Sequence, residues 1–266
     1  GMGRDWLEKV PELDTTFGRG YGEEVDWCRK VARLGGLHLG LPGLFVEHRG
    51  GESFGSTEKL ALVAKNNAII SRRYPRYDQL VQTFIAADPM VTARLALGLA
   101  WAASLDETRP VPIYLAHAMG GGADHWLEHR IQGDLDAGRP SVVLRVGGPN
   151  RWRLELVTPT GRTHGATDRD DVIVQLLTVL PRRRVIYSCG VGDPYPVALP
   201  EMLCALLGSP EDGAELLFHD FFPLSPSYTL LDSDGVYRGA PVPDSTGASP
   251  AMRSIRRIRR AVRTVP

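Results

Sequence analysis

The sequence predicts an α/β protein in which a mostly helical region is followed by a parallel β-sheet with helices between its strands. Three observations lead to this prediction. The chain has 266 residues, 43% of them hydrophobic and 23% charged, so it can bury one large core or two small ones. Between residues 23 and 104, apolar side chains recur at helical spacing. From residue 112 onward, short apolar runs alternate with helical stretches, which is typical of βαβ units.

The N-terminal region is expected to contain three helices, over residues 23–34, 57–73 and 76–104. The first has one apolar face and ends at Gly35-Gly36, and a short extended segment up to His48 follows it. The second ends where Tyr74 precedes a proline, and the third is interrupted at Asp88-Pro89. The polar segment 106–112 carries two prolines and is expected to link the two regions.

The C-terminal region is expected to alternate strands and helices. The expected strands are 112–118, 141–146, 153–157, 185–189 and 215–218, and the expected helices are 123–137, 169–180 and 195–207. Strands separated by helices of this length indicate a parallel sheet.

Composition excludes several classes of protein. The 31 Lys and Arg residues balance 31 Asp and Glu residues, so no strong overall field favours nucleic acid. The three cysteines are far apart, which argues against a disulfide framework or a zinc site and favours a reducing cytoplasm. No apolar run reaches the roughly 18 residues that a membrane span needs.

A glycine-rich turn, Gly18 to Gly22, delivers the acids Glu23, Glu24 and Asp26 into the first turn of the first helix. One interpretation is structural, because acids at a helix N-terminus cap free N–H groups and complement the helix dipole. The other is chemical. An aromatic residue at the site and a His-Arg-Gly-Gly sequence from His48, followed by Ser-Phe, favour the chemical interpretation.

Together these motifs resemble the acceptor-side half of the inverting, GT-A-fold nucleotide-sugar glycosyltransferases of family two. The matching runs are residues 13–17, 20–28, 45–54, 66–67 and 73–77. The resemblance implies that residues 1–106 form the C-terminal part of a GT-A-like domain. The donor half of that family, with its Asp-x-Asp motif, has no counterpart before Gly1.

The resemblance also implies roles for individual residues. Glu24 would be the general base that deprotonates the acceptor, while Glu23 and Asp26 would hold acceptor hydroxyls. By its position in the family motif, Trp27 would contact the substrate; the alternative is that it packs in the core beneath the helix. His48 matches a position near a divalent cation, Mn or Mg in the intact enzyme, although a lone histidine can equally be a structural hydrogen bonder.

A second group of motifs lies in the C-terminal region. Gly120, Gly121 and Gly122 follow a strand and begin a helix, a place where backbone N–H groups can bind a phosphate. Glycine clusters at such turns are, however, often only structural. His125 follows in that helix. His219 and Asp220 end a later strand, at the carboxyl edge where ligands gather in open α/β sheets.

These motifs, with the run from Leu231 to Tyr237, resemble the N-terminal, acceptor-side Rossmann domain of the GT-B glycosyltransferases of family four. The resemblance implies a Rossmann-like domain over residues 110–245, in which Gly120 to Gly122, His125, His219 and Asp220 contact substrate. The donor-binding Rossmann domain of that family has no counterpart after Pro266.

Residues 246–266 form a basic tail with six arginines around an apolar stripe. One interpretation is a peripheral helix at the inner face of a membrane, and the other is a frayed or out-of-frame tail.

The expected function is therefore glycosyl transfer in cell-envelope polysaccharide assembly. The partners would be a nucleotide-sugar donor, a sugar or glycolipid acceptor and the missing flanking glycosyltransferase halves, with no nucleic acid. This chain alone is expected to show no transfer. The alternative is a non-catalytic α/β binding or scaffolding module, in which the acids only cap a helix.

Overall fold

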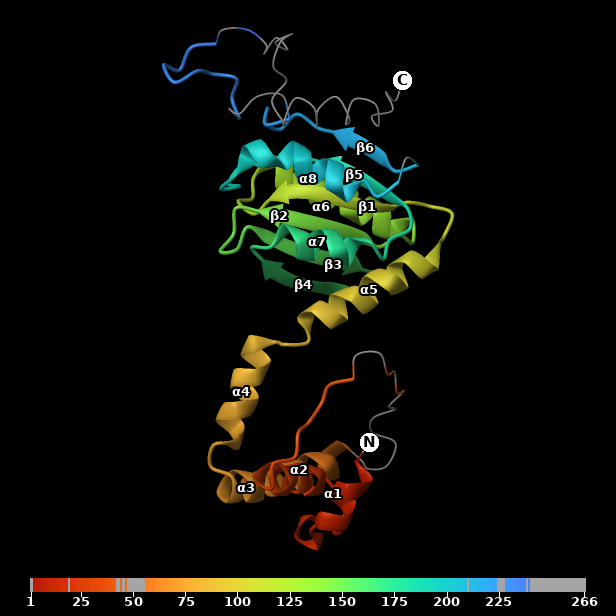
Figure 1. The fold of residues 1–266 in the computed structure, drawn as a ribbon, viewed down its shortest axis with the longest axis vertical. Helices are drawn as coiled ribbons and strands as arrows, with labels where there is room; N and C mark the ends of the chain where they lie inside the picture. Colours follow the sequence, from red (N-terminus) through yellow and green to blue (C-terminus); the bar gives the residue numbers. More distant parts are fainter. Residues whose placement is uncertain are drawn as a thin grey trace. The chain divides into compact units, whose positions relative to one another are not determined.

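The computed structural model describes residues 2–18, 20–41, 44, 46, 56–209, 211–223, 228–237 and 239. The chain divides into two compact units, Gly1–Met90 and Val91–Pro266 (Figure 1). The division precedes helix α5 (Val91–Leu105) rather than falling at the polar segment 106–112. The reason is that α5 buries Leu95 and Leu99 in the core of the second unit, against the sheet.

The first unit is helical. Its elements are α1 (Arg4–Lys9), the 3-10 helix η1 (Thr15–Phe17), α2 (Glu23–Arg33), α3 (Ser56–Arg73) and α4 (Tyr77–Ala87). The predicted helices 23–34 and 57–73 are confirmed as α2 and α3, and the interruption at Asp88-Pro89 separates α4 from α5. Helix α1 was not predicted, because it has only 6 residues, fewer than two turns, and buries none of them. Phe17, Ile70 and Tyr74 form the core of this unit.

The second unit is an α/β structure built on one six-stranded sheet. Its strands are β1 (Val111–His117), β2 (Ser141–Val146), β3 (Trp152–Thr158), β4 (Gly161–Thr167), β5 (Arg183–Tyr187) and β6 (Gly213–Leu216), in the order β4-β3-β2-β1-β5-β6. Besides α5, its helices are α6 (Gly122–Asp136), α7 (Asp170–Leu177), η2 (Pro196–Ala198) and α8 (Leu199–Leu206). The predicted α/β class is confirmed.

The sheet is mixed, so the prediction of a wholly parallel sheet is wrong at two of its five strand pairings. Strands β2, β1, β5 and β6 run parallel, but β3 is antiparallel to both β2 and β4. Only two residues, Pro159 and Thr160, separate β3 from β4, and a connection this short can join only antiparallel strands. Strand β4 was missed because it is a largely exposed edge strand of Gly, Arg, Thr and His without apolar alternation.

Helices cover the two faces of the sheet unequally. One core cluster gathers residues of α5, α7 and α8 against one face, including Ile113 and Leu115 of β1. The other cluster joins Leu127 and Ile131 of α6 to the opposite face, which carries Tyr114 of β1. All seven residues of β1 are buried, as expected for a central strand covered on both sides (Figure 1).

The path of the chain creates a switch point beside β1. From β1 the chain passes through α6 to β2 on one side, and it later returns to form β5 on the other side. In open α/β sheets, ligands bind at the carboxyl ends of the strands flanking such a point.

No single helix in the described ranges is long and apolar enough to cross a membrane. Helices α4 and α5 meet the criteria of length and composition only when they are counted together.

Candidate functional site

Helix α3 holds the glycine-rich turn before α2. The amide Nδ2 of buried Asn66 donates to the backbone oxygens of Phe17 and Gly20, both at 2.8 Å. Gly22 is the N-cap of α2 at φ 121°, and a Cβ there would lie 2.9 Å from the Phe17 ring. Only glycine fits at this position, so the turn has a defined shape that sets where α2 begins.

The two acids at the start of α2 have different surroundings. Glu24 is exposed, and its Oε2 accepts a hydrogen bond from the backbone N–H of Gly22 at 3.2 Å. Glu23 is half-buried, and its Oε2 is enclosed without a hydrogen-bond partner among the described residues. One carboxylate oxygen of Glu24 thus caps the helix, as the structural interpretation requires, while the side chain remains open to a substrate.

Asp26 lies in a buried ionic network. Its Oδ1 accepts from Tyr74 at 2.8 Å and from Arg73 at 3.0 Å, and its Oδ2 lies 2.6 Å from Nζ of Lys30. Arg73 also reaches Asp14 at 2.7 Å. Burial alone would raise the pKa of Asp26, but these donors outweigh it and hold the pKa below its ordinary value. With both oxygens paired and 1% of the residue exposed, Asp26 does not fit the expected role of an acceptor contact.

Trp27 belongs to the core of the first unit. It is 5% exposed, and its indole N–H donates to the backbone oxygen of Val10 at 2.8 Å. This geometry agrees with the helix-core interpretation and leaves no open face for a sugar. His48 lies outside the described residues, as do the rest of the His-Arg-Gly-Gly sequence and the basic tail 246–266.

The glycine loop after β1 has an open backbone. Gly121 is the N-cap of α6, with φ 89° and ψ −164°, a conformation reserved for glycine. A Cβ on Gly120, Gly121 or Gly122 would meet no atom within 4 Å. The backbone conformation explains the glycine at 121, and the open space lets a ligand approach this loop closely.

His219 lies at the same edge of the sheet as the glycine loop. Strands β1 and β6, which precede the two motifs, are both parallel to β5. The ring of His219 meets Trp126 of α6 edge-on at 5.7 Å, and its Nδ1 lies 3.1 Å from Oγ of Ser188, just after β5. The predicted common edge is therefore confirmed. His125 is exposed in the first turn of α6, where its backbone N–H donates to Gly121.

Asp220 has a structural position instead. It is 2% exposed and accepts from the Tyr187 hydroxyl and the Gly190 N–H, both at 2.6 Å, and from the Phe222 N–H at 3.0 Å. Burial, together with this carboxylate, raises the pKa of Tyr187 far above its ordinary value. Asp220 thus fixes the loop after β5 and does not fit the expected substrate contact.

Sequence reasoning missed two features of the carboxyl edge. A Cβ on Gly192 would lie 2.9 Å from Cα of Gly147, so the loops after β5 and β2 cross at glycines. Arg151, whose side chain is 10% exposed, lies 3.4 Å from Asp193 and 2.9 Å from Asp170 and joins these loops to α7. The glycines that follow β2 and β5 were the sequence signal that could have predicted this close approach.

The described residues do not form a site for the expected divalent cation. Within them, no group of three His, Cys, Asp or Glu side chains could hold a metal ion. The divalent cation therefore stays a prediction.

Comparison with protein-family models, curated proteins and solved structures found no match for the chain. The functional assignment therefore rests on the residues and on their geometry.

Proposed function

We propose that this chain is part of a nucleotide-sugar-dependent glycosyltransferase and that its first unit supplies the acceptor-side base, Glu24. The observation that carries the proposal is an exposed carboxylate at the start of α2 on a turn that buried groups hold in place. Asn66 of α3 donates hydrogen bonds to the backbone of the turn, and the hydrogen bonds of Asp26 connect α2 to the C-terminal end of α3. A group held in this way can meet a substrate without first being ordered.

The proposed reaction is an inverting displacement. The Glu24 carboxylate takes the proton of an acceptor hydroxyl, whose oxygen attacks the anomeric carbon of the donor sugar. The bond from that carbon to the nucleoside diphosphate breaks, and the diphosphate leaves with the bonding electrons. Glu23, the half-buried residue before Glu24, would accept a hydrogen bond from a second acceptor hydroxyl.

The second unit supports the proposal through its carboxyl edge. The open glycine loop follows β1, and Gly147 and Gly192 meet after β2 and β5, the strands on either side of β1. The exposed His219 lies at the same edge, beside Ser188 after β5. In open α/β sheets this edge is the usual place for ligands. We therefore propose that the second unit is a second glycosyltransferase-like module and that its sugar-bearing substrate binds at this edge.

A transfer assay on the full-length protein that carries these residues tests the role of Glu24. We expect transfer of sugar from a panel of nucleoside-diphosphate sugars to glycolipid and saccharide acceptors to fall about 10²- to 10⁴-fold in Glu24→Gln, the usual contribution of a general base. The matched control is Glu12→Gln, which alters an exposed acid outside this turn. Donor binding, measured by calorimetry, should stay unchanged in both variants.

Unchanged transfer in Glu24→Gln would exclude Glu24 as the base.

The second candidate is a non-catalytic α/β binding module. It is favoured by the structural positions of Asp26, Trp27 and Asp220 and by the capping bond from Gly22 to Glu24. In that case neither the full-length protein nor its variants would release nucleoside diphosphate from any donor in the panel.

A further inference from the structure

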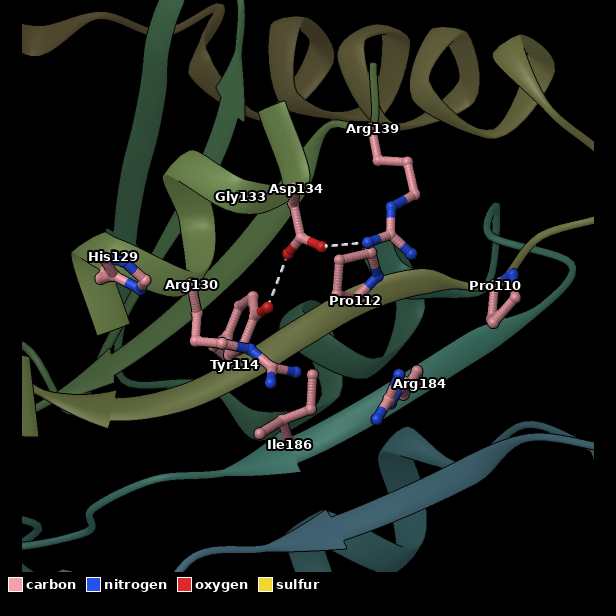
Figure 2. Close-up of a pocket in the computed structure, with 10 residues that line it drawn as sticks. All are labelled: Pro110, Pro112, Tyr114, His129, Arg130, Gly133, Asp134, Arg139, Arg184 and Ile186. Atoms are coloured by element: carbon pink, nitrogen blue, oxygen red, sulfur yellow. Dashed lines mark hydrogen bonds and ion pairs between the residues drawn. The ribbon is translucent and has the colours of Figure 1, made fainter. Parts of the chain in front are cut away.

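A cavity of about 320 Å³ opens on the second unit, beside the last turns of α6 and above the first residues of β1 and β5 (Figure 2). It lies toward the amino ends of these strands, whereas the glycine loop and His219 follow carboxyl ends. The volume is in the range of small-molecule sites. None of the residues singled out from the sequence lines it.

Basic side chains from three different elements line this cavity. Arg130 comes from α6, Arg139 from the segment after it and Arg184 from β5 (Figure 2). Their acidic neighbours are Asp134, 2.7 Å from Arg139, and Glu215, 2.6 Å from Arg184 and 3.9 Å from Arg130. Three guanidinium groups thus share two carboxylates, which leaves one positive charge unbalanced.

Asp134 has little capacity left to neutralise that charge. Besides Arg139, it accepts from the Tyr114 hydroxyl at 2.6 Å (Figure 2) and from Ser141 at 3.0 Å. Burial, together with the hydrogen bond to Asp134, raises the pKa of Tyr114 to about 12, so this hydroxyl remains a donor at neutral pH. Asp134 is 6% exposed and serves to hold α6 against β1 and β2.

One donor atom of a residue that lines the cavity has no partner within the described ranges. Nε of Arg139 is enclosed and has no hydrogen-bond partner in the part of the chain that the structure describes. Each guanidinium carries five N–H groups in a planar fork that matches phosphate oxygens. Pro110, Pro112 and Ile186 add apolar wall beside these donors, which suits the carbon skeleton of a small ligand.

We propose that this cavity binds a small phosphate monoester, with Arg130, Arg139 and Arg184 around the phosphate group. Donors that arrive from three elements suit a tetrahedral dianion with several acceptor oxygens better than a planar carboxylate with one charge. The open cavity, of about 320 Å³, admits a ligand of sugar-phosphate size. This inference is independent of the role proposed for Glu24, because it rests on residues of the other unit.

Calorimetric titration of residues 1–266 tests the proposal, with glucose 6-phosphate, inorganic phosphate and acetate as probes. We expect saturable binding of glucose 6-phosphate at one site, weaker binding of inorganic phosphate and the weakest binding of acetate. Arg130→Gln and Arg184→Gln should each weaken phosphate binding about tenfold or more, because each removes a charge-assisted hydrogen bond.

The matched control is Arg169→Gln, which removes the same charge from an exposed arginine at the start of α7. It should bind as the wild type does. Arg184→Lys keeps the charge and should recover part of the affinity, and it serves as the second variant if Arg184→Gln unfolds. The absence of saturable binding, or equal losses in Arg169→Gln and the two cavity variants, would overturn the proposal.

Discussion

Neighbouring acids in α2 acquire different roles from their surroundings. Glu24 keeps its side chain exposed, whereas Asp26, two positions later, turns inward to Arg73, Tyr74 and Lys30. A buried charge is tolerated only when it is paired, so Asp26 depends on these partners and they depend on it. At the scale of single residues, this network fixes the position of α2 and therefore the position of Glu24.

Replacement of Asp26 by asparagine should destabilise the first unit by about 2 kcal/mol. The loss stays below the ~3–5 kcal/mol of a fully buried pair, because Arg73 and Lys30 are partly exposed and can regain water. Hydrogen exchange of the α2 and α3 amides at neutral pH measures it, with Asp5→Asn in exposed α1 as control.

The effect should depend on pH, because the pKa of Asp26 is lowered in the folded state from an ordinary value of 3.8. The stabilisation is complete above that value and is lost as the pH falls through the lower, folded pKa. The difference between wild type and variant should therefore shrink below about pH 4. A difference independent of pH would mean that packing, not charge, carries the effect.

Glycines at two positions of one helix should respond in opposite directions. Gly121, the N-cap of α6, has a backbone conformation that other residues reach only at a cost, although nothing occupies the space around it. Gly133 lies inside the same helix, also with free space for a Cβ, and has ordinary helical geometry. At the scale of the element, the backbone conformation of each glycine, rather than steric contact of an added Cβ, decides how a substitution changes stability.

We expect Gly121→Ala to destabilise the second unit by about 1–3 kcal/mol. Gly133→Ala should stabilise it by about 0.5–1 kcal/mol, because alanine has less backbone freedom to lose on folding. Urea denaturation of both variants measures the difference. If the two substitutions had equal effects, the strained conformation at Gly121 would be contradicted.

The whole molecule has separate cores in its two units. The core of the first unit includes Phe17, Ile70 and Tyr74, while the clusters of the second unit draw on residues from Val91 onward. Helix α5 decides the boundary, because Leu99 is fully buried against the sheet of the second unit. Separate cores are expected to unfold in separate transitions.

Leu99→Ala should lower the stability of the second unit by about 2–5 kcal/mol, the usual cost of such a cavity. Scanning calorimetry should show two transitions, of which Leu99→Ala shifts one and Asp26→Asn the other. Leu97→Ala, on the exposed side of α5, is the matched control and should shift neither strongly. A single transition shifted by both core variants would show that the units unfold together.

Most individual elements were predictable from sequence, because helix and strand formation depends on side chains only a few positions apart. The spacing of Trp27 and Val31 predicted α2, and the apolar run around Tyr114 predicted β1. The common edge of the glycine loop and His219 was also predictable, because both follow strands of one parallel set. Strand β4 was not, since its residues carry no apolar alternation and are defined only by pairing with β3.

The sequence by itself determined the α/β class, the positions of most helices and strands, and which residues could carry chemistry. Only the tertiary structure decided what each of those residues does. Asp26 and Asp220 became structural because distant donors, Arg73 and Tyr187, reach them. The arginine-lined cavity likewise exists only where α6 and β5 come together. The physical reason is that periodicity reports on neighbours along the chain, whereas burial and pairing depend on residues that meet only after folding.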